Sequence, residues 1–207
     1  MGALERIAYN VGRRDEVPNQ ELARDLAARR DAEGIAEIAD HLEDRNKSIA
    51  SDCLKVLYEV GYIVPSLIEP YTDRFLALLS SPNNRMVWGS MIALWTVASA
   101  QADTIWGEVD LVMDTVREGT VITTVSGVKA LAIVASKAPE YEARIRPFLL
   151  DVLMGCEPKL VATHAEDMLV MVDEGNRDEM VSVLEGRMGE LSPSQGTRVR
   201  RVLKRLS

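Results

Sequence analysis

The chain has 207 residues, of which 47 % are hydrophobic and only 5 % aromatic, so we expect a largely aliphatic core. Its formal charge of −8 disfavours general nucleic-acid binding, since an acidic protein repels the phosphate backbone. Two cysteines make a disulfide framework unexpected, and no apolar run approaches the roughly 18 residues that a membrane span requires. Because the N-terminus also lacks a signal-peptide pattern, we expect a cytoplasmic protein that does not enter a membrane.

Apolar residues recur at intervals of three and four along most of the chain, which predicts helices. Residues 121–125 would indicate a strand if taken alone, but their place in the repeat described below predicts the start of a helix. Asn19, just after Pro18, is a candidate N-cap. In chain order, the predicted helices span residues 3–12 and 19–30, then 34–44 with 47–61, 70–80 with 84–99, 107–118 with 122–137, 142–155 with 159–173, and 178–190 with 194–206.

A repeat of 37 or 38 residues organises these helix pairs. Each second helix carries a leucine, with a valine three residues later and a small residue four residues earlier. A period of this length is typical of solenoids, in which each unit buries its apolar face against its neighbours. The three series are Leu57, Leu94, Leu131 and Leu169; Val60, Val97, Val134 and Val172; and Cys53, Ser90, Gly127 and Ala165.

The segment from Leu79 to Leu94 resembles a HEAT repeat, with Val87, Ser90 and Leu94 at the family's valine, small and leucine positions. It departs from the family at Trp88, where arginine is frequent, and at Ser81, where aspartate is frequent. The resemblance implies an all-α fold, a right-handed α–α superhelix of about five to six antiparallel helix pairs. One HEAT-like domain would then cover 1–207, with N-terminal capping helices in 1–33, core repeats in 34–181 and a C-terminal capping pair in 182–207.

HEAT-like solenoids usually serve as scaffolds for protein partners, so we expect a protein or peptide on the concave face. If the second helices line that face, positions five before, two before and two after each repeat leucine point outward. Mixed charges along this stripe suit a polypeptide better than a polyanion, and the alternative interpretation is that these positions are merely solvated. The candidate partner-binding residues are Asp52, Lys55, Glu59, Ser126, Lys129, His164 and Asp167.

The three tryptophans and the basic C-terminal helix can each be interpreted as a binding feature or as a structural one. Trp88, Trp95 and Trp106 could anchor a partner, although packing between helices is the favoured interpretation for the first two. Five cations between Arg198 and Arg205 could bind an anionic surface. A polar outer face on a terminal capping helix explains them better.

The sequence offers no catalytic constellation. His41 and His164 lack the spacing of metal ligands, and Cys53 lies in the small-residue series, which predicts a buried thiol. We therefore predict a non-catalytic interaction scaffold without a metal or cofactor. The alternatives are a nucleic-acid-binding protein similar to the HEAT-like DNA alkylation-repair glycosylases, and a lyase or enzyme subunit similar to the HEAT-like bilin lyases.

Overall fold

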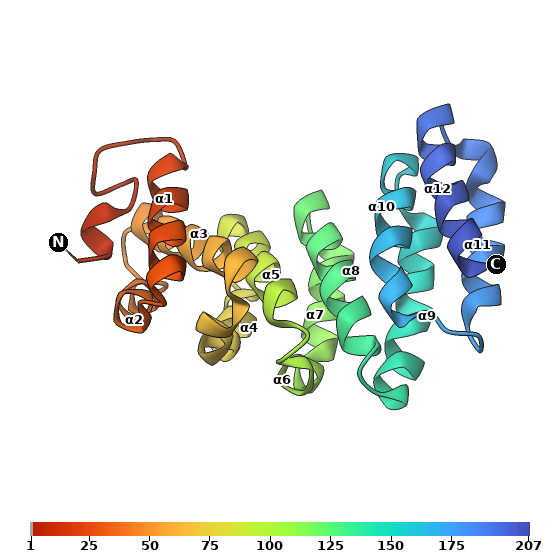
Figure 1. Cartoon of the computed structure of the whole chain (residues 1–207), viewed down its shortest axis with the longest axis horizontal. Helices are drawn as coiled ribbons and strands as arrows, with labels where there is room; N and C mark the ends of the chain where they lie inside the picture. Colours follow the sequence, from red (N-terminus) through yellow and green to blue (C-terminus); the bar gives the residue numbers. More distant parts are fainter. Residues whose placement is uncertain (1) are drawn as a thin grey trace. The chain divides into compact units, whose positions relative to one another are not determined.

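A computed structural model describes residues 2–207, and within that range the chain forms twelve α-helices, five short 3-10 helices and no strand (Figure 1). The all-α prediction is therefore confirmed. Residues 121–125 open a helix, as the repeat predicted. The α-helices are α1 (Val17–Arg29), α2 (Ala32–Asp40), α3 (Lys47–Ile63), α4 (Thr72–Leu78), α5 (Asn84–Val97), α6 (Ala102–Gly107), α7 (Val109–Glu118), α8 (Val121–Ala135), α9 (Pro139–Gly155), α10 (Pro158–Met168), α11 (Arg177–Arg187) and α12 (Pro193–Leu206).

The largest departures from the predicted helices lie outside the regular repeat. Between residues 3 and 12 only Leu4–Arg6 is helical, as a 3-10 turn, and the chain turns at Gly12, whose φ is 72°. The short helix α6 was not predicted. Asn19 is not an N-cap, because α1 begins two residues earlier and the Asn19 side chain is buried inside it. Side-chain N-caps are instead supplied elsewhere by Asp31, Asn46, Asn83 and Ser192.

Packing divides the chain into two compact units, one ending at Glu108 and one spanning Val109–Ser207. In the N-terminal unit α3 contacts both α1 and α5, while α2 packs on α3 and α4 packs on α5. In the C-terminal unit α10 contacts both α8 and α12, while α7 packs on α8 and α11 packs on α12. Among residues 2–207, no helix combines the length and the hydropathy needed to cross a bilayer.

The repeat leucines Leu57, Leu94 and Leu131 are fully buried, as predicted. The fourth position is Met168, which is 1 % exposed, whereas Leu169 is only half-buried. The third interval is therefore 37 residues, like the others, and the predicted register of the fourth repeat was one residue too late. The same shift puts buried Met171 in the valine series.

The C-terminus of α9 is closed by a side chain from α11. Arg187 is buried and donates to the carbonyl oxygens of Leu153 at 2.7 Å, Met154 at 2.6 Å and Cys156 at 2.7 Å. The last carbonyls of a helix lack partners within the helix, and a cation there also complements the helix dipole. Arg187 therefore joins α11 to α9 and satisfies backbone carbonyls at the end of α9 that have no partner within the helix.

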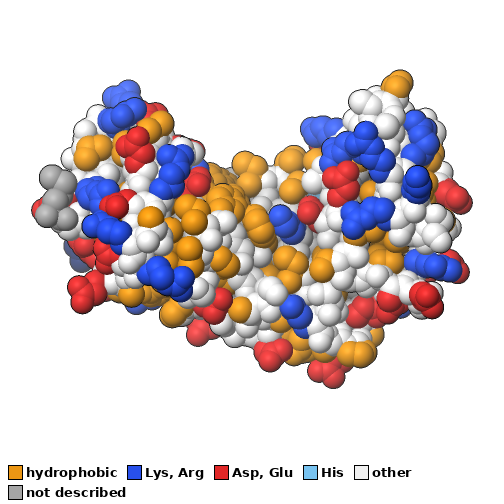
Figure 2. All heavy atoms as spheres, viewed as in Figure 1, with side chains coloured by type: hydrophobic (Ala, Val, Ile, Leu, Met, Phe, Trp, Pro, Cys, Tyr) orange, Lys and Arg blue, Asp and Glu red, His pale blue; other side chains and the backbone are white. Residues whose placement is uncertain are grey.

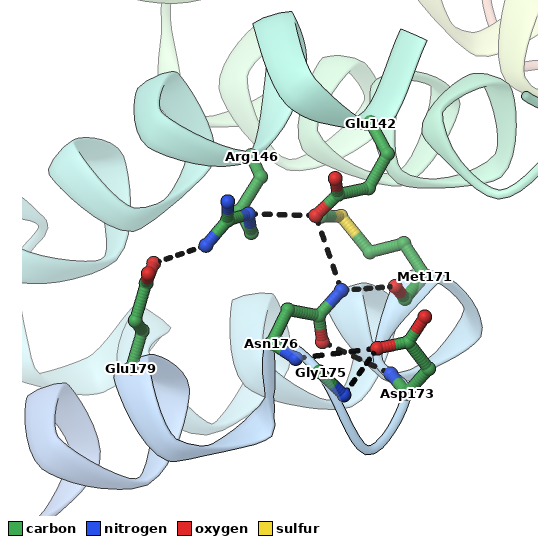
Figure 3. A network of polar contacts seen from close by, with 7 residues as sticks. All are labelled: Glu142, Arg146, Met171, Asp173, Gly175, Asn176 and Glu179. Atoms are coloured by element: carbon green, nitrogen blue, oxygen red, sulfur yellow. Dashed lines mark hydrogen bonds and ion pairs between the residues drawn. The ribbon is translucent and has the colours of Figure 1, made fainter. Parts of the chain in front are cut away.

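A second polar network joins α9 to the turn before α11 (Figure 3). Arg146 forms ion pairs with Glu142 and Glu179, and the Asn176 amide donates to Glu142 at 3.1 Å. The Asp173 carboxylate accepts hydrogen bonds from the backbone amides of the turn itself. Residues 173–176 thus form a hydrogen-bonded turn directly before α11.

The corrected register predicts unequal costs for two adjacent truncations. Met168→Ala should lower the free energy of unfolding by about 2–5 kcal/mol, because it leaves a cavity in a fully buried layer. Leu169→Ala should cost clearly less, because part of that side chain already contacts solvent. Urea unfolding monitored by circular dichroism measures both values, and a larger loss for Leu169→Ala would restore the original register.

The role of Arg187 can be tested by replacing it with methionine, which keeps the length of the side chain but removes its donors. Arg187→Met should destabilise the protein by about 1–3 kcal/mol, because the carbonyls at the end of α9 lose their partners. The matched control is Arg205→Met on an exposed face of α12, which should stay within about 0.5 kcal/mol of the parent protein. Equal melting of the two variants would contradict the capping role.

Candidate functional site

A pocket of about 320 Å³ lies in the N-terminal unit, between the segment that precedes α1 and the first turns of α3 and α5. Three predicted partner-binding residues lie in or beside it: Asp52 and Lys55 line the pocket, and Glu59 is one helical turn further along α3. The wall combines aromatic rings with charges of both signs. Its charged and aromatic lining residues are Tyr9, Arg13, Arg14, Asp15, Glu16, Asp52, Lys55, Tyr58, Arg85 and Trp88.

Asp52 fixes the inner wall of the pocket. Its carboxylate accepts hydrogen bonds from the Tyr9 backbone amide at 2.8 Å and from Nδ2 of Asn19 at 2.9 Å. The Asn19 side-chain oxygen in turn accepts from the Ala8 amide at 2.8 Å. Because Asn19 is buried, these bonds attach the N-terminal segment to α1 and α3. Asp52 is therefore engaged within the protein.

Lys55 is held between two carboxylates. Its Nζ lies 2.8 Å from Glu16 and 2.8 Å from Glu59, and only 12 % of its side chain is exposed. Burial disfavours the charged amine, but hydrogen bonds to Glu16 and Glu59 outweigh that effect and raise the pKa of Lys55. The ammonium group also lies 4.8 Å from the centre of the Tyr58 ring. Lys55 thus carries a permanent, largely compensated charge.

Four aromatic side chains form a continuous cluster beside the pocket, on α3 and α5. Tyr58 lies 5.9 Å from Tyr62 and 6.2 Å from Trp88 between ring centres, and Tyr62 lies 5.5 Å from Trp95. Burial raises the pKa of Tyr58 to about 12, so its hydroxyl stays protonated at neutral pH. Tyr62 is 47 % exposed and both tryptophans are half-buried. Figure 2 shows hydrophobic side chains gathered on this face over α3 and α5.

Two arginines at the pocket lack carboxylate partners. Arg13 is paired with Asp15 at 2.9 Å, but Arg14 and Arg85 are exposed and form no ion pair within residues 2–207. The repeat could not indicate either residue, because Arg14 lies in an irregular segment and Arg85 lies in the first turn of α5, outside the predicted stripe. Arg14 directly precedes Asp15, and Arg85 lies three residues before Trp88. This proximity to a charged or aromatic residue is the signal in the sequence that could have indicated them as binding residues.

The remaining predicted site residues lie in the C-terminal unit and are not a comparable surface. Ser126 on α8 and His164 on α10 are buried, so they present no surface to a partner. Lys129 and Asp167 are half-buried near one another: burial raises the pKa of Asp167, and the Lys129 charge partly offsets that rise. The register shift explains the burial of His164, which occupies the position equivalent to Cys53, Ser90 and Gly127.

With the register corrected, Thr163 and Glu166 take the outward stripe positions on α10, and both contact Arg198 of α12. The Arg198 guanidinium lies 2.6 Å from the Glu166 carboxylate and 3.2 Å from the Thr163 hydroxyl. The apolar side of α12 is buried at Val199, Val202 and Leu206. That arrangement agrees with a capping role for the basic helix.

Groups able to transfer protons or attack as nucleophiles near neutral pH are not assembled at the pocket. Burial raises the pKa of the Cys53 thiol to about 12, and burial lowers the pKa of His164 to about 4. His164 is fully buried and neither ring nitrogen has a hydrogen-bond partner in the described chain. Throughout residues 2–207, no group of three or more His, Cys, Asp or Glu side chains is arranged to hold a metal ion.

Comparison with known proteins supports the fold but names no function. No family model matches the sequence, and no curated protein matches it. Two crystal structures of engineered proteins from the Northeast Structural Genomics Consortium are similar. One has 17 % sequence identity and a TM-score of 0.68, covering 100 % of this chain and 97 % of its own. The other has 18 % identity and a TM-score of 0.64, covering 98 % of this chain and 57 % of its own.

The buried His164 makes stability depend on pH. Its folded pKa of about 4 lies below its ordinary value of 6.5, so the unfolded chain binds the proton more tightly. The free energy of unfolding should therefore fall as pH decreases from about 6.5 to about 4, with His164 contributing about 2–3 kcal/mol of the loss. Urea unfolding at several pH values measures it, and His164→Met should remove that part. Identical pH profiles for both proteins would contradict a neutral buried imidazole.

Proposed function

We propose that this protein is a HEAT-like repeat protein that acts as a non-catalytic scaffold for protein partners. Its binding surface would be the pocket together with the aromatic cluster of Tyr58, Tyr62, Trp88 and Trp95. The observation that carries the proposal is the continuity of these rings on α3 and α5 beside two unpaired guanidinium groups. Aromatic and arginine side chains dominate the binding energy of protein interfaces.

The repeat assignment is supported by polar contacts that recur at nearly one repeat length. Arg74 contacts Asp40, Arg144 contacts Asp110, and Arg187 contacts the Leu153 carbonyl, each at a separation of 34 residues. Positions nearly one repeat apart are therefore in contact within each unit, which is the pattern expected of stacked repeats. We infer that both units are short stacks of HEAT-like helix pairs. The 37-residue spacing between Leu94 and Leu131 supports one repeat series along the sequence.

A binding role fits the electrostatics of the pocket better than a catalytic one. General acid–base catalysis requires a group whose pKa lies near the working pH. The pKa values of Lys55 and Tyr58 are both raised away from neutrality, so each keeps one protonation state. Asp52 accepts two hydrogen bonds that fix the pocket wall. Lys55 and Tyr58 therefore shape the surface without changing protonation near neutral pH.

A polyanion is a less suitable occupant. Asp15, Glu16 and Asp52 interrupt the cations of the pocket, so a long chain of phosphates finds no continuous basic surface there. The cations of α12 are distributed around a docked apolar face, and Arg198 is already paired with Glu166. We therefore place nucleic-acid binding, in the manner of the alkylation-repair glycosylases, below protein binding. The lyase alternative has no support beyond the repeat itself.

The proposal predicts that a partner contacts Tyr62. A photo-reactive amino acid at position 62 of the whole chain should cross-link the partner, which mass spectrometry then identifies. The same group at position 170, an exposed valine of the C-terminal unit, serves as the control and should not capture it. With the partner purified, Tyr62→Ala should weaken binding about tenfold or more, because an exposed aromatic anchor is lost.

The matched variant Val170→Ala should leave that affinity within about twofold of the parent value, since isolated exposed apolar residues contribute little. Val170→Ala should melt like the parent protein. Tyr62→Ala should melt somewhat lower, because it loses the ring contacts with Tyr58 and Trp95, and binding is therefore compared at a temperature where both variants are folded. Unchanged affinity on Tyr62→Ala, or capture from position 170 alone, would contradict the assignment of the binding surface.

A further inference from the structure

The pocket contains two positively charged side chains that have no carboxylate partner among residues 2–207 and that come from different elements. Four cations and three carboxylates line it. Arg13 is paired with Asp15 and Lys55 with Glu16, while the third carboxylate, Asp52, accepts hydrogen bonds from neutral groups. Arg14 reaches it from the segment before α1, and Arg85 reaches it from the first turn of α5. Both remain exposed without an ion pair in the described chain. The two free guanidinium groups thus belong to different elements that border one cavity.

Guanidinium groups favour planar anions, since two parallel N–H donors match the two oxygens of a carboxylate. The same cavity offers Tyr58 and Trp88, whose ring centres are 6.2 Å apart. An occupant that carries a carboxylate next to an apolar or aromatic group would use both features. The volume of about 320 Å³ is at the lower end for binding pockets, so it suits a few side chains.

We propose that this pocket binds an acidic peptide segment, with Glu or Asp carboxylates on Arg14 and Arg85 and an adjacent apolar side chain against Tyr58 and Trp88. The inference rests on the proposed function and names the class of partner segment. The carboxylates that line the pocket favour a polypeptide over a nucleic acid as its occupant. A peptide backbone presents N–H donors that Glu16 and Asp15 can accept, whereas a chain of phosphates presents only acceptors to them.

Lys55 and Asp52 have positioning roles in this arrangement. Lys55 draws Glu16 and Glu59 together, at 2.8 Å each, so neither carboxylate is left to repel the incoming peptide at full charge. Asp52 holds Tyr9 and thereby the segment that carries Arg14. The cations that remain available to the peptide are therefore the guanidinium groups of Arg14 and Arg85. The ammonium group of Lys55 is already engaged by Glu16 and Glu59.

The test uses the whole chain and labelled probes of known composition. Fluorescence anisotropy should show binding of a short peptide of glutamates around one phenylalanine, with affinity that decreases as salt increases. A peptide with lysine in place of each glutamate should bind at least about tenfold more weakly, because it meets unpaired guanidinium groups. A peptide with alanine in place of phenylalanine should also bind more weakly, and a single-stranded DNA oligonucleotide should not compete.

Charge reversal locates the site. The double substitution Arg14→Glu with Arg85→Glu should weaken binding of the acidic peptide about tenfold or more. Arg85→Lys should give a smaller loss, because it keeps the positive charge but loses the paired N–H donors of the guanidinium. The control is Arg24→Glu, an exposed arginine of α1 outside the pocket, which should stay within about twofold. If the double variant unfolds, the single Arg85→Gln substitution provides the comparison.

Two failures can be told apart. If the partner found through position 62 binds but neither the acidic peptide nor the arginine substitutions have an effect, the peptide assignment is wrong and the scaffold proposal stands. If Tyr62→Ala leaves partner binding unchanged, the scaffold surface is wrong whatever the peptide does. Preference for the lysine peptide, or arginine-dependent binding of the oligonucleotide, would also overturn the inference.

Discussion

The structure depends on one constraint: each helix pair buries its aliphatic face mainly against the pairs next to it in the same unit. Leu57, Leu94, Leu131 and Met168 form the recurrent buried positions, and all four are shielded from solvent. Within each unit these positions lie on helices that contact one another: α3 packs on α5, and α10 packs on α8. Polar contacts also join positions nearly one repeat apart, as the 34-residue separations of the Arg74–Asp40 and Arg187–Leu153 contacts show.

The candidate site arises where this regularity stops. Residues before α1 do not form a helix pair, so they fold back onto α1 and α3 through Asn19 and Asp52. That segment brings Tyr9 and Arg14 to the side of α3, next to α1. A hollow with unpaired cations and exposed rings can persist there because the aliphatic layer is already complete beneath it.

Sequence periodicity predicted the helices that carry the repeated apolar positions and missed the segments that lie outside the repeat. Helices α3, α5 and α8 could be located because their apolar spacing and repeat positions agree. Met168 was passed over because leucine and methionine are both long and apolar, so position 169 satisfied the pattern equally well. Helix α6 and the fold of residues 3–12 have no repeat to identify them. Arg14 and Arg85 meet only in three dimensions, through the N-terminal segment and α5.

The predicted stripe shows why a polar position on a helix such as α3 is not necessarily a contact for a partner. Lys55 and Asp52 were chosen as polar residues on the outward side of α3, and both are engaged in internal bonds that hold the pocket. Their substitution would disturb the wall before it removed any contact with a partner, since an unpaired Glu16 and a released Tyr9 would follow. The residues whose loss reports on binding alone are those without internal partners, such as Arg85. For that reason burial and pairing, rather than polarity, distinguish a recognition residue from a structural one in this fold.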